Sequence, residues 1–195
     1  SKAAKFNLSA VETVPNLFGE QRLGRKGTEQ VGRLLLEGDN EAAIMLMLKN
    51  PKSADRIREA KELSGGSWDD ALYHPSFRFS YGFEIEKWQS YLWNQLLPEQ
   101  MEKLGSNLSA TLPMWQPNLN VSAMYKHLWD PKRSKLNWQA VKVLAGNERS
   151  TMMHPVDFRA EPEEMGWRCK FDLGPSEYAT VALAEVFKLE NPHNK

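Results

Sequence analysis

The sequence predicts an α+β protein, because helical and strand patterns occupy different parts of the chain. Through the middle of the 195 residues, apolar side chains recur at three- and four-residue spacing, which is typical of helices packed against a core. Residues 165–173 instead alternate between apolar and polar side chains, which is the period of a half-buried strand. We therefore expect a mainly helical middle, framed by a loop near the N-terminus and by a strand, turn and helix at the C-terminus.

The first part of the chain predicts a loop and three short helices. Residues 14–26 combine Pro, Asn and Gly with few apolar residues in register, which predicts a structured loop. Capping residues and apolar spacing then define the helices. These lie between Thr28 and Gly38, from Asp39 to about Lys49, and from Ser53 to Leu63, before Gly65 and Gly66 break the chain.

The longest predicted helix covers about residues 81–97 and carries an aromatic stripe that includes Phe83, Trp88 and Tyr91. An irregular stretch with room for one short strand follows over 107–120. We then expect short helices over 121–129 and 137–144, a strand over 150–156, the alternating strand over 165–173, a turn at 174–176 and a closing helix over 178–189.

Composition excludes several classes of protein. With 41% apolar and 26% charged residues, the chain can bury a core without staples and is not disordered. Cys169 is the only cysteine, which excludes an internal disulfide and favours a reducing, intracellular compartment. The longest apolar run, Ala42–Leu48, is far shorter than the roughly 20 residues that span a membrane, so we expect no membrane segment.

The pattern of histidine and cysteine residues does not indicate a metal site or a cysteine nucleophile. The four histidines are scattered, and none stands three or four residues from another ligand-type residue on a recognisable metal-site helix. Cys169 falls on the apolar face of the alternating strand, so we expect a buried, inert thiol rather than a nucleophile. The sequence therefore predicts no metal site.

Lysine plus arginine equals aspartate plus glutamate at 25 each, so a nucleic-acid partner would have to bind a local basic patch. Trp129 and Trp138 bracket one such cluster and add the stacking surface that binders of single-stranded RNA use. Solvated surface is nevertheless the commoner fate of charge clusters. The two clusters are Arg22, Arg25, Lys26 and Arg33, and the run from Lys126 to Arg149 that includes Lys132 and Arg133.

The loop over residues 14–24 reads Val-Pro-Asn-Leu-Phe-Gly-Glu-Gln-Arg-Leu-Gly and places an amide, an aromatic ring and a guanidinium group between glycines that permit close backbone approach. It resembles the hallmark segment of the TruD-type tRNA pseudouridine synthases, Val-Pro-Asn-Tyr-Phe-Gly-x-Gln-Arg-Phe-Gly. Leu17 and Leu23 stand where that family prefers aromatic residues. The matching positions include Pro15, Asn16, Phe18, Gly19, Gln21, Arg22 and Gly24.

Three further stretches resemble the same family in the same order. Residues 88–94, Trp-Gln-Ser-Tyr-Leu-Trp-Asn, are similar to its aromatic-Gln-Ser-Tyr-Leu-aromatic-Asn helix. Residues 171–180 are similar to its C-terminal Phe-x-Leu-Pro-x-Gly-Ser-Tyr-Ala-Thr segment. A weaker stretch between them matches at Gly146, Arg149, Pro155 and Asp157. The resemblance thus spans nearly the whole chain.

The resemblance implies an isomerase that detaches, turns over and reattaches a uracil base of tRNA or rRNA after the base has been extruded from its stack, with no cofactor. It implies that Tyr178 stacks on the target base, so Tyr178 and Gln21 should form two walls of one base-sized slot. The loop residues implied to bind substrate are Asn16, Phe18, Gly19, Gln21 and Arg22. Candidate contacts to the RNA backbone are Arg25, Lys26, Lys132 and Arg133.

Two departures from the family pattern stand out. Gly174-Pro175-Ser176-Glu177 replaces Pro-x-Gly-Ser, and negative charge beside Tyr178 would weaken RNA binding. The family's catalytic aspartate lies in a Gly-x-Lys-Asp-x-x-Ala-Val-Thr segment ahead of the loop, and no part of this chain resembles that segment; Asp130 lies in the wrong part of the order. We therefore name no catalytic residue and expect the chain to begin about where the second half of such an enzyme would.

Two functions remain open: part of an active pseudouridine synthase separated from its catalytic half, or an inactive RNA-binding or assembly scaffold, for example in a ribonucleoprotein such as an organellar ribosome. Both predict that residues 1–26 and 150–195 belong to a pseudouridine-synthase-like mixed-sheet core, with residues 27–149 as a helical inserted domain. Half a core leaves sheet edges unpaired, so we expect a partner chain to cover one. The survival of Gln21, Arg22 and Tyr178 favours the enzyme, and the changes at Leu17, Leu23, Gly174 and Glu177 favour the scaffold.

Overall fold

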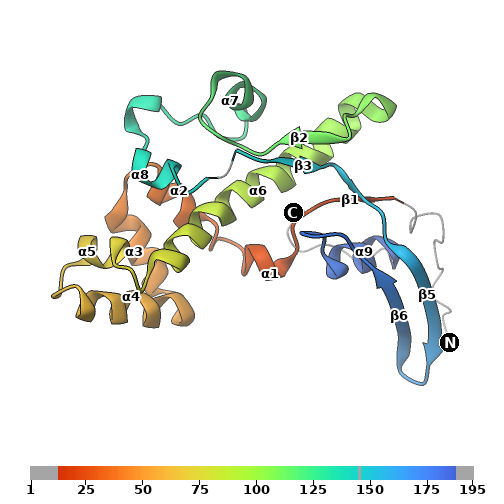
Figure 1. Cartoon of the computed structure of the whole chain (residues 1–195), viewed down its shortest axis with the longest axis horizontal. Coiled ribbons are helices and arrows are strands. Elements are labelled where there is room, and N and C mark those ends of the chain that lie inside the picture. The colour runs from red at the N-terminus through yellow and green to blue at the C-terminus, as the bar shows by residue number, and fades with distance from the viewer. Residues whose placement is uncertain (1–12, 145, 188–195) are drawn as a thin grey trace. The chain divides into compact units, whose positions relative to one another are not determined.

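The computed structural model describes residues 13–144 and 146–187 and confirms the predicted α+β class (Figure 1). Within this part of the chain, helices predominate and the strands form separate two-stranded sheets. The helices are α1 (Glu20–Leu23), α2 (Gln30–Leu36), α3 (Asn40–Leu48), α4 (Pro51–Leu63), α5 (Trp68–Tyr73), α6 (Arg78–Leu104), α7 (Leu119–Tyr125), α8 (Trp138–Val141) and α9 (Ala179–Val186). The strands are β1 (Val14–Pro15), β2 (Thr111–Pro113), β3 (Glu148–Ser150), β4 (Met152–Met153), β5 (Val156–Glu163) and β6 (Gly166–Asp172).

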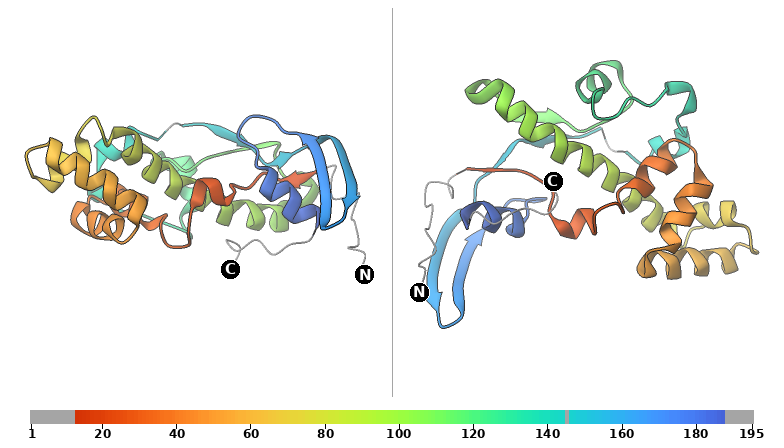
Figure 2. Two further views of the ribbon diagram at one scale, coloured as in Figure 1. Left: turned by 90° about the horizontal axis from the view of Figure 1, so that it is seen from below. Right: turned by 180° about the vertical axis from the view of Figure 1, so that it is seen from behind.

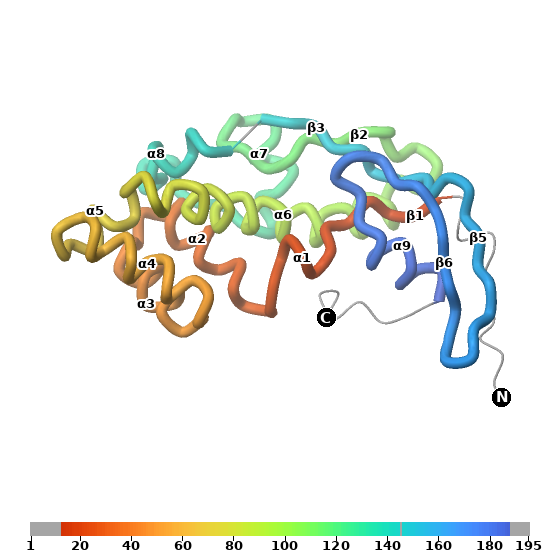
Figure 3. Tube along the Cα trace, turned by 60° about the horizontal axis from the view of Figure 1, so that its bottom comes forward, coloured from red at the N-terminus to blue at the C-terminus, as the bar shows by residue number. Residues whose placement is uncertain are grey.

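The described chain forms two compact units. The helical unit contains Arg22–Trp93 and Pro113–Asn147, and the sheet unit contains the described residues of Ser1–Gln21, Asn94–Leu112 and Glu148–Lys195. Helix α6 runs continuously from one unit into the other (Figure 3). The division into a synthase-like core and an inserted domain concerns the layout of the family and stays a prediction.

In the helical unit, α2 to α5 are short helices that pack against their neighbours in the chain, and α8 packs on α2 (Figure 2). Local signals set their ends as predicted: the Asp39 side chain caps α3 by accepting from the backbone N–H of Ala42 at 3.1 Å, and Gly38 follows α2 with a φ of 75°. Helix α4 begins at Pro51 rather than at Ser53, because Asn50 caps it and proline suits the first helical turn.

Helix α6 extends beyond the predicted range of 81–97 at both ends. Its aromatic stripe is core, since Trp88, Leu92 and Trp93 are all less than 5% exposed. Pro98 lies inside the helix without ending it, although proline removes one backbone donor. No helix in the described residues is both long and apolar enough to cross a membrane.

In the sheet unit, the strand predicted over 150–156 is divided into β3, β4 and the start of β5. Thr151 lies between β3 and β4: its backbone N–H donates to the Ala110 carbonyl at 3.0 Å, and its carbonyl accepts from the Asn16 N–H at 2.9 Å. The chain therefore changes partner at Thr151, because β3 pairs with β2 whereas β4 pairs antiparallel with β1. The loop predicted over 14–26 is irregular apart from β1 and the single turn of α1.

Strand β6 confirms the predicted alternation but not the predicted burial. Trp167 is 41% exposed and Met165 97% exposed, because β5 and β6 form a two-stranded hairpin and not the covered face of a larger sheet. The expectation of a buried Cys169 is therefore wrong, as its side chain is half-buried. Partial burial still raises the pKa of the Cys169 thiol, which disfavours the nucleophilic thiolate.

Helices α2 and α6 cross closely at Gly32. A Cβ at this position would lie 2.1 Å from the backbone carbonyl oxygen of Glu84, so α2 can approach α6 only because Gly32 has no side chain. We expect Gly32→Ala to lower the free energy of unfolding by at least about 2 kcal/mol in urea denaturation.

Gly82→Ala is the matched control, because Gly82 is also helical and its Cβ would meet only a Val143 methyl group at 3.2 Å. Alanine is favoured over glycine by about 1 kcal/mol in a helix, so this variant should be close to neutral or more stable. Equal destabilisation by the two variants would contradict the proposed crossing.

Candidate functional site

A buried arginine holds the N-terminal loop of the sheet unit. Arg149, on β3, is 8% exposed, and Asn16 is 3% exposed. The guanidinium group of Arg149 donates from Nε to the Asn16 carbonyl at 3.1 Å and from Nη2 to the Asn16 Oδ1 at 2.6 Å. The same Nη2 donates to the carbonyl of Ser176 at 2.9 Å. One side chain thus ties the loop to the turn that precedes α9.

Asn94 fixes the next part of the loop from α6. Its Oδ1 accepts from the backbone N–H of Phe18 at 2.8 Å, and its Nδ2 donates to the Phe18 carbonyl at 2.9 Å. This pair satisfies both backbone groups of one buried residue, as a neighbouring strand would. The Phe18 ring also lies under the Arg149 guanidinium, whose Cζ is 3.9 Å from the ring centroid.

The loop and the start of α9 meet at Gly19. The rings of Phe18 and Tyr178 lie 5.9 Å apart between centroids with a tilt of 59°. A Cβ on Gly19 would lie 2.8 Å from the Oε1 of Gln21, 2.9 Å from the Oγ1 of Thr180 and 3.1 Å from the Cδ1 of Tyr178. Gln21 and Tyr178 therefore converge around Gly19, where a side chain would force Gln21 and Thr180 to move.

Two polar side chains at this meeting point are open to solvent. Thr180 Oγ1 donates to Gln21 Oε1 at 3.2 Å, and both residues are exposed, whereas Tyr178 is half-buried. The amide nitrogen of Gln21 donates to no group among the described residues, so it can still bind an outside acceptor. Amide, hydroxyl and aromatic face together are the groups that a planar base with a hydrogen-bonding edge requires.

The structure gives a physical reason for the two changes in the turn before α9. Ser176 has a φ of 64°, in the left-handed region that favours glycine, and it stands where the resemblance places glycine. The Glu177 carboxylate folds back onto its own turn, where Oε2 accepts from the Gly174 N–H at 2.7 Å. Leu17 and Leu23 are both buried, so the loss of aromatic residues at these positions changes core packing.

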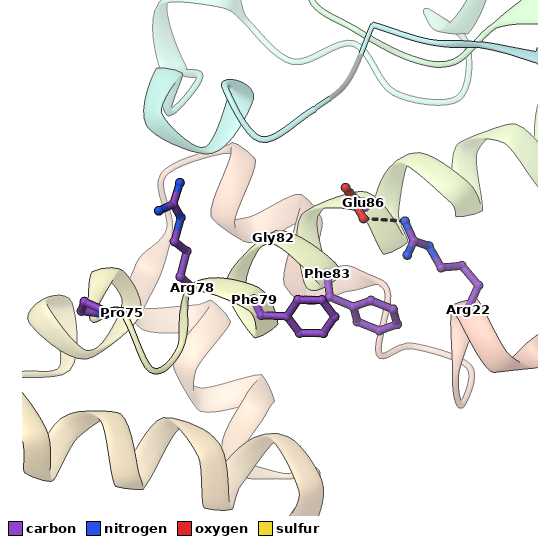
Figure 4. A pocket seen from close by; sticks show the side chains of 7 residues that line it. All are labelled: Arg22, Pro75, Arg78, Phe79, Gly82, Phe83 and Glu86. Atoms are coloured by element: carbon purple, nitrogen blue, oxygen red, sulfur yellow. Dashed lines mark hydrogen bonds and ion pairs between the residues drawn. The ribbon is translucent and has the colours of Figure 1, made fainter. Parts of the chain in front are cut away.

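Arg22 belongs to the helical unit, where its charge is paired. It donates from Nη2 to the Glu86 carboxylate at 2.7 Å and from Nε to the Ser90 hydroxyl at 3.3 Å (Figure 4). Its guanidinium carbon lies 5.0 Å from the centroid of the Phe83 ring. The implied role of Arg22 in binding substrate stays a prediction.

The four predicted backbone contacts are all exposed side chains of the helical unit: Arg25, Lys26, Lys132 and Arg133. Lys132 and Arg133 line a pocket of about 280 Å³ together with Trp115 and Trp129. The Arg133 guanidinium carbon also lies 5.4 Å from the ring centroid of Trp138, which is 44% exposed. Cation and aromatic ring are thus combined here, as the sequence pattern indicated.

Sequence reasoning did not assign Arg149, Asn94 or Thr180 to the site. All three are polar residues inside the stretches that match the family, and no role had been assigned to them there. Their presence in these motifs is the sequence signal that could have pointed to them. Their contacts join positions between 76 and 159 residues apart, which no local pattern can reveal. Among the residues that the structure describes, no three His, Cys, Asp or Glu side chains are grouped closely enough to hold a metal ion.

Comparisons with known proteins agree on one family. The family model described as tRNA pseudouridine synthase D (TruD) matches residues 1–82. The tRNA pseudouridine synthase D of Marinobacter nauticus is 26% identical over 198 residues, covering 93% of this chain and 49% of that protein. The protein of the same name from Xanthomonas euvesicatoria is 24% identical over 206 residues, covering 91% of this chain and 54% of that protein.

One solved structure has a similar fold. It is a crystal structure of a Methanosarcina mazei protein described as tRNA pseudouridine synthase D (TruD), with a TM-score of 0.57 and 18% sequence identity over 95% of this chain and 63% of that one. The chain spans about half the length of the curated relatives that it matches.

The conformation of Ser176 makes a stability prediction. A residue other than glycine in the left-handed region destabilises the folded state by roughly 1–2 kcal/mol. Replacing it by glycine removes this strain, but part of the gain is lost because glycine has more conformational freedom in the unfolded chain. We expect Ser176→Gly to raise the free energy of unfolding by about 0.5–1 kcal/mol in urea denaturation. Ser134→Gly, at an exposed residue of a 3-10 turn where φ is not positive, should instead lower it; a loss of stability in Ser176→Gly would contradict the turn geometry.

Proposed function

Because the chain belongs to the TruD family of tRNA pseudouridine synthases, we propose that it forms the RNA-binding part of a uridine-isomerising enzyme. In this proposal an extruded uridine of tRNA or another RNA is held where the loop meets Tyr178. The observation that carries the proposal is the convergence of Phe18, Gln21 and Tyr178 around the side-chain-free position Gly19.

The residues at this point supply what an extruded uracil needs. The half-buried ring of Tyr178 offers a stacking surface, and Phe18 and Arg149 support it from behind. The free amide nitrogen of Gln21 can donate to a uracil carbonyl, and the Thr180 hydroxyl lies within hydrogen-bonding distance of the same amide. Gly19 lets the RNA approach the backbone closely.

The reaction itself is an isomerisation. The bond between the sugar C1′ and the uracil N1 breaks, a bond between C1′ and C5 forms, and the proton displaced from C5 is balanced by one gained at N1. No atom or electron is added, so the step needs no cofactor. In our proposal the family's aspartate is supplied from outside these 195 residues, by a further segment or a partner chain, because no part of this chain resembles the segment that carries it.

A partner chain also fits the sheet unit. Each sheet in the described residues has two strands, and exposed strand edges offer unpaired backbone groups to another chain. The alternative of an inactive RNA-binding scaffold would keep the same RNA contact, and the measurements below separate the two.

Stacking on Tyr178 predicts a clear pattern of RNA affinities. Tyr178→Ala should weaken binding of a transcribed tRNA about tenfold, because base stacking on an aromatic ring contributes about 1–3 kcal/mol, whereas Tyr178→Phe keeps the ring and should bind like the parent. Met45→Ala removes an exposed apolar side chain of α3 and serves as the control. Fluorescence anisotropy at fixed salt measures the affinities, and equal binding by Tyr178→Ala and the parent would remove the proposed base contact.

Isomerisation of uridine on transcribed tRNA, measured for the chain alone and for the chain with any co-purifying protein, distinguishes an enzyme from a scaffold. We expect activity only in the presence of a partner or segment that supplies the aspartate. Activity of the chain alone would contradict the assignment of the aspartate to another segment, and lack of activity with every co-purifying protein would favour the scaffold.

A further inference from the structure

A groove of about 480 Å³ lies in the helical unit, and its lining includes none of the residues that form the proposed uridine contact. The first two turns of α6 form its floor, with Arg78, Phe79, Gly82, Phe83 and Glu86, and Arg22 forms one side (Figure 4). Every lining residue belongs to the same unit, so the groove is defined within it.

Phe79 is the anomaly in this groove. Its side chain is 80% exposed, although Phe77, just before α6, and Tyr81, two residues further along it, are almost completely buried. The Phe79 ring lies nearly parallel to the half-buried ring of Phe83, with an interplanar angle of 18° and centroids 6.4 Å apart. Figure 4 shows the two rings side by side along the floor of the groove. An aromatic platform is therefore presented to solvent on a rigid helix that the core holds in place.

The charge around this platform is positive. Glu86, the only acidic residue in the lining, is neutralised by Arg22 at 2.7 Å. Arg78 is exposed and makes no ion pair among the residues that the structure describes. Arg56 adds a third guanidinium group to this end of α6, because its Nη1 donates to the Ser80 hydroxyl at 3.3 Å. The groove thus favours an anionic ligand.

A planar anionic ligand fits these features better than a protein surface does. Protein-binding patches usually carry a contiguous apolar area, whereas here one exposed ring, stacked on a half-buried one, is flanked by guanidinium groups. Aromatic rings beside arginine side chains are the combination that binds unpaired nucleotides, since every base has a π-face and every linkage has a phosphate. A duplex hides the faces of its bases, so the ligand has to be single-stranded at this point.

We propose that this groove is a second RNA contact, in which an unpaired nucleotide stacks its base on Phe79 and Arg78 binds an adjacent phosphate. The inference rests on the proposed RNA-binding function and adds a site that prefers single-stranded RNA. Arg22 pairs with Glu86, lies over the Phe83 ring and so forms one side of the groove.

The test uses fluorescence anisotropy with a labelled, unstructured 12-nucleotide RNA at two salt concentrations. Phe79→Ala should weaken binding about tenfold, and Phe79→Trp should bind at least as tightly as the parent, because tryptophan keeps the stacking surface. Arg78→Ala should weaken binding about threefold to tenfold and make the salt dependence shallower, since one phosphate contact is lost.

Matched controls come from α4 of the same unit. Leu63→Ala removes an apolar side chain that is 58% exposed, and Lys52→Ala removes an exposed charge. Neither residue lines the groove, so both variants should bind the RNA like the parent. All substitutions are at exposed positions, and thermal unfolding should be unchanged.

Binding of Phe79→Ala within twofold of the parent, while Tyr178→Ala remains defective, would overturn this inference and leave the proposed function intact. An absence of RNA binding by the parent would overturn both. Polyglutamate, added at the same charge concentration as the RNA, serves as a competitor without bases. If it displaced the RNA equally well from the parent and from Phe79→Ala, the groove would recognise charge alone, and this result would overturn the stacking contact. Weaker binding of Phe79→Ala to the 12-nucleotide RNA, with unchanged binding to a duplex of the same sequence, is the expected result.

Discussion

The buried guanidinium group of Arg149 is the interaction on which the proposed site depends. A charge removed from water is stable in a protein only when hydrogen bonds replace its hydration, and the planar fork of arginine can donate to several acceptors at once. Here it donates to two oxygens of Asn16 and to the carbonyl of Ser176, and it stacks on Phe18. The loop and the turn before α9 consequently share one fixed partner, which places Tyr178 against the loop.

This arrangement gives a physical meaning to motifs that are far apart in the sequence. The N-terminal loop, the end of the Trp-Gln-Ser-Tyr-Leu-Trp-Asn stretch and the C-terminal turn are joined by Asn94 and Arg149 into one cluster of buried polar contacts. Some motif residues therefore support the site and others face outward. The side-chain oxygen of Asn16 accepts a hydrogen bond from Arg149, whereas Gln21 and Thr180 are exposed, where a base could reach them.

Features set by neighbouring residues could be predicted from the sequence, and features set by distant partners could not. Asp39 caps α3 and Gly38 ends α2 because the reasons lie within a few residues. The alternation around Cys169 correctly predicted a strand. Alternation shows only that successive side chains point to opposite faces and not what covers each face, so the predicted burial of Cys169 was wrong. The family motifs predicted the meeting of the loop with Tyr178, whereas the contact between Asn16 and Arg149 spans 133 residues and leaves no periodic signal.

A double-mutant cycle between Asn16→Ala and Arg149→Ala tests the central claim most directly. The free energy of unfolding is measured by urea denaturation for the parent, both single variants and the double variant, and the coupling energy isolates the contact between the two side chains. Because a hydrogen bond to a charged group contributes about 1.5–3 kcal/mol, we expect a coupling energy of at least about 1.5 kcal/mol. Additive effects of the two substitutions would show that the contact between the Arg149 guanidinium group and the Asn16 side chain does not stabilise the loop, and would contradict our description of the site.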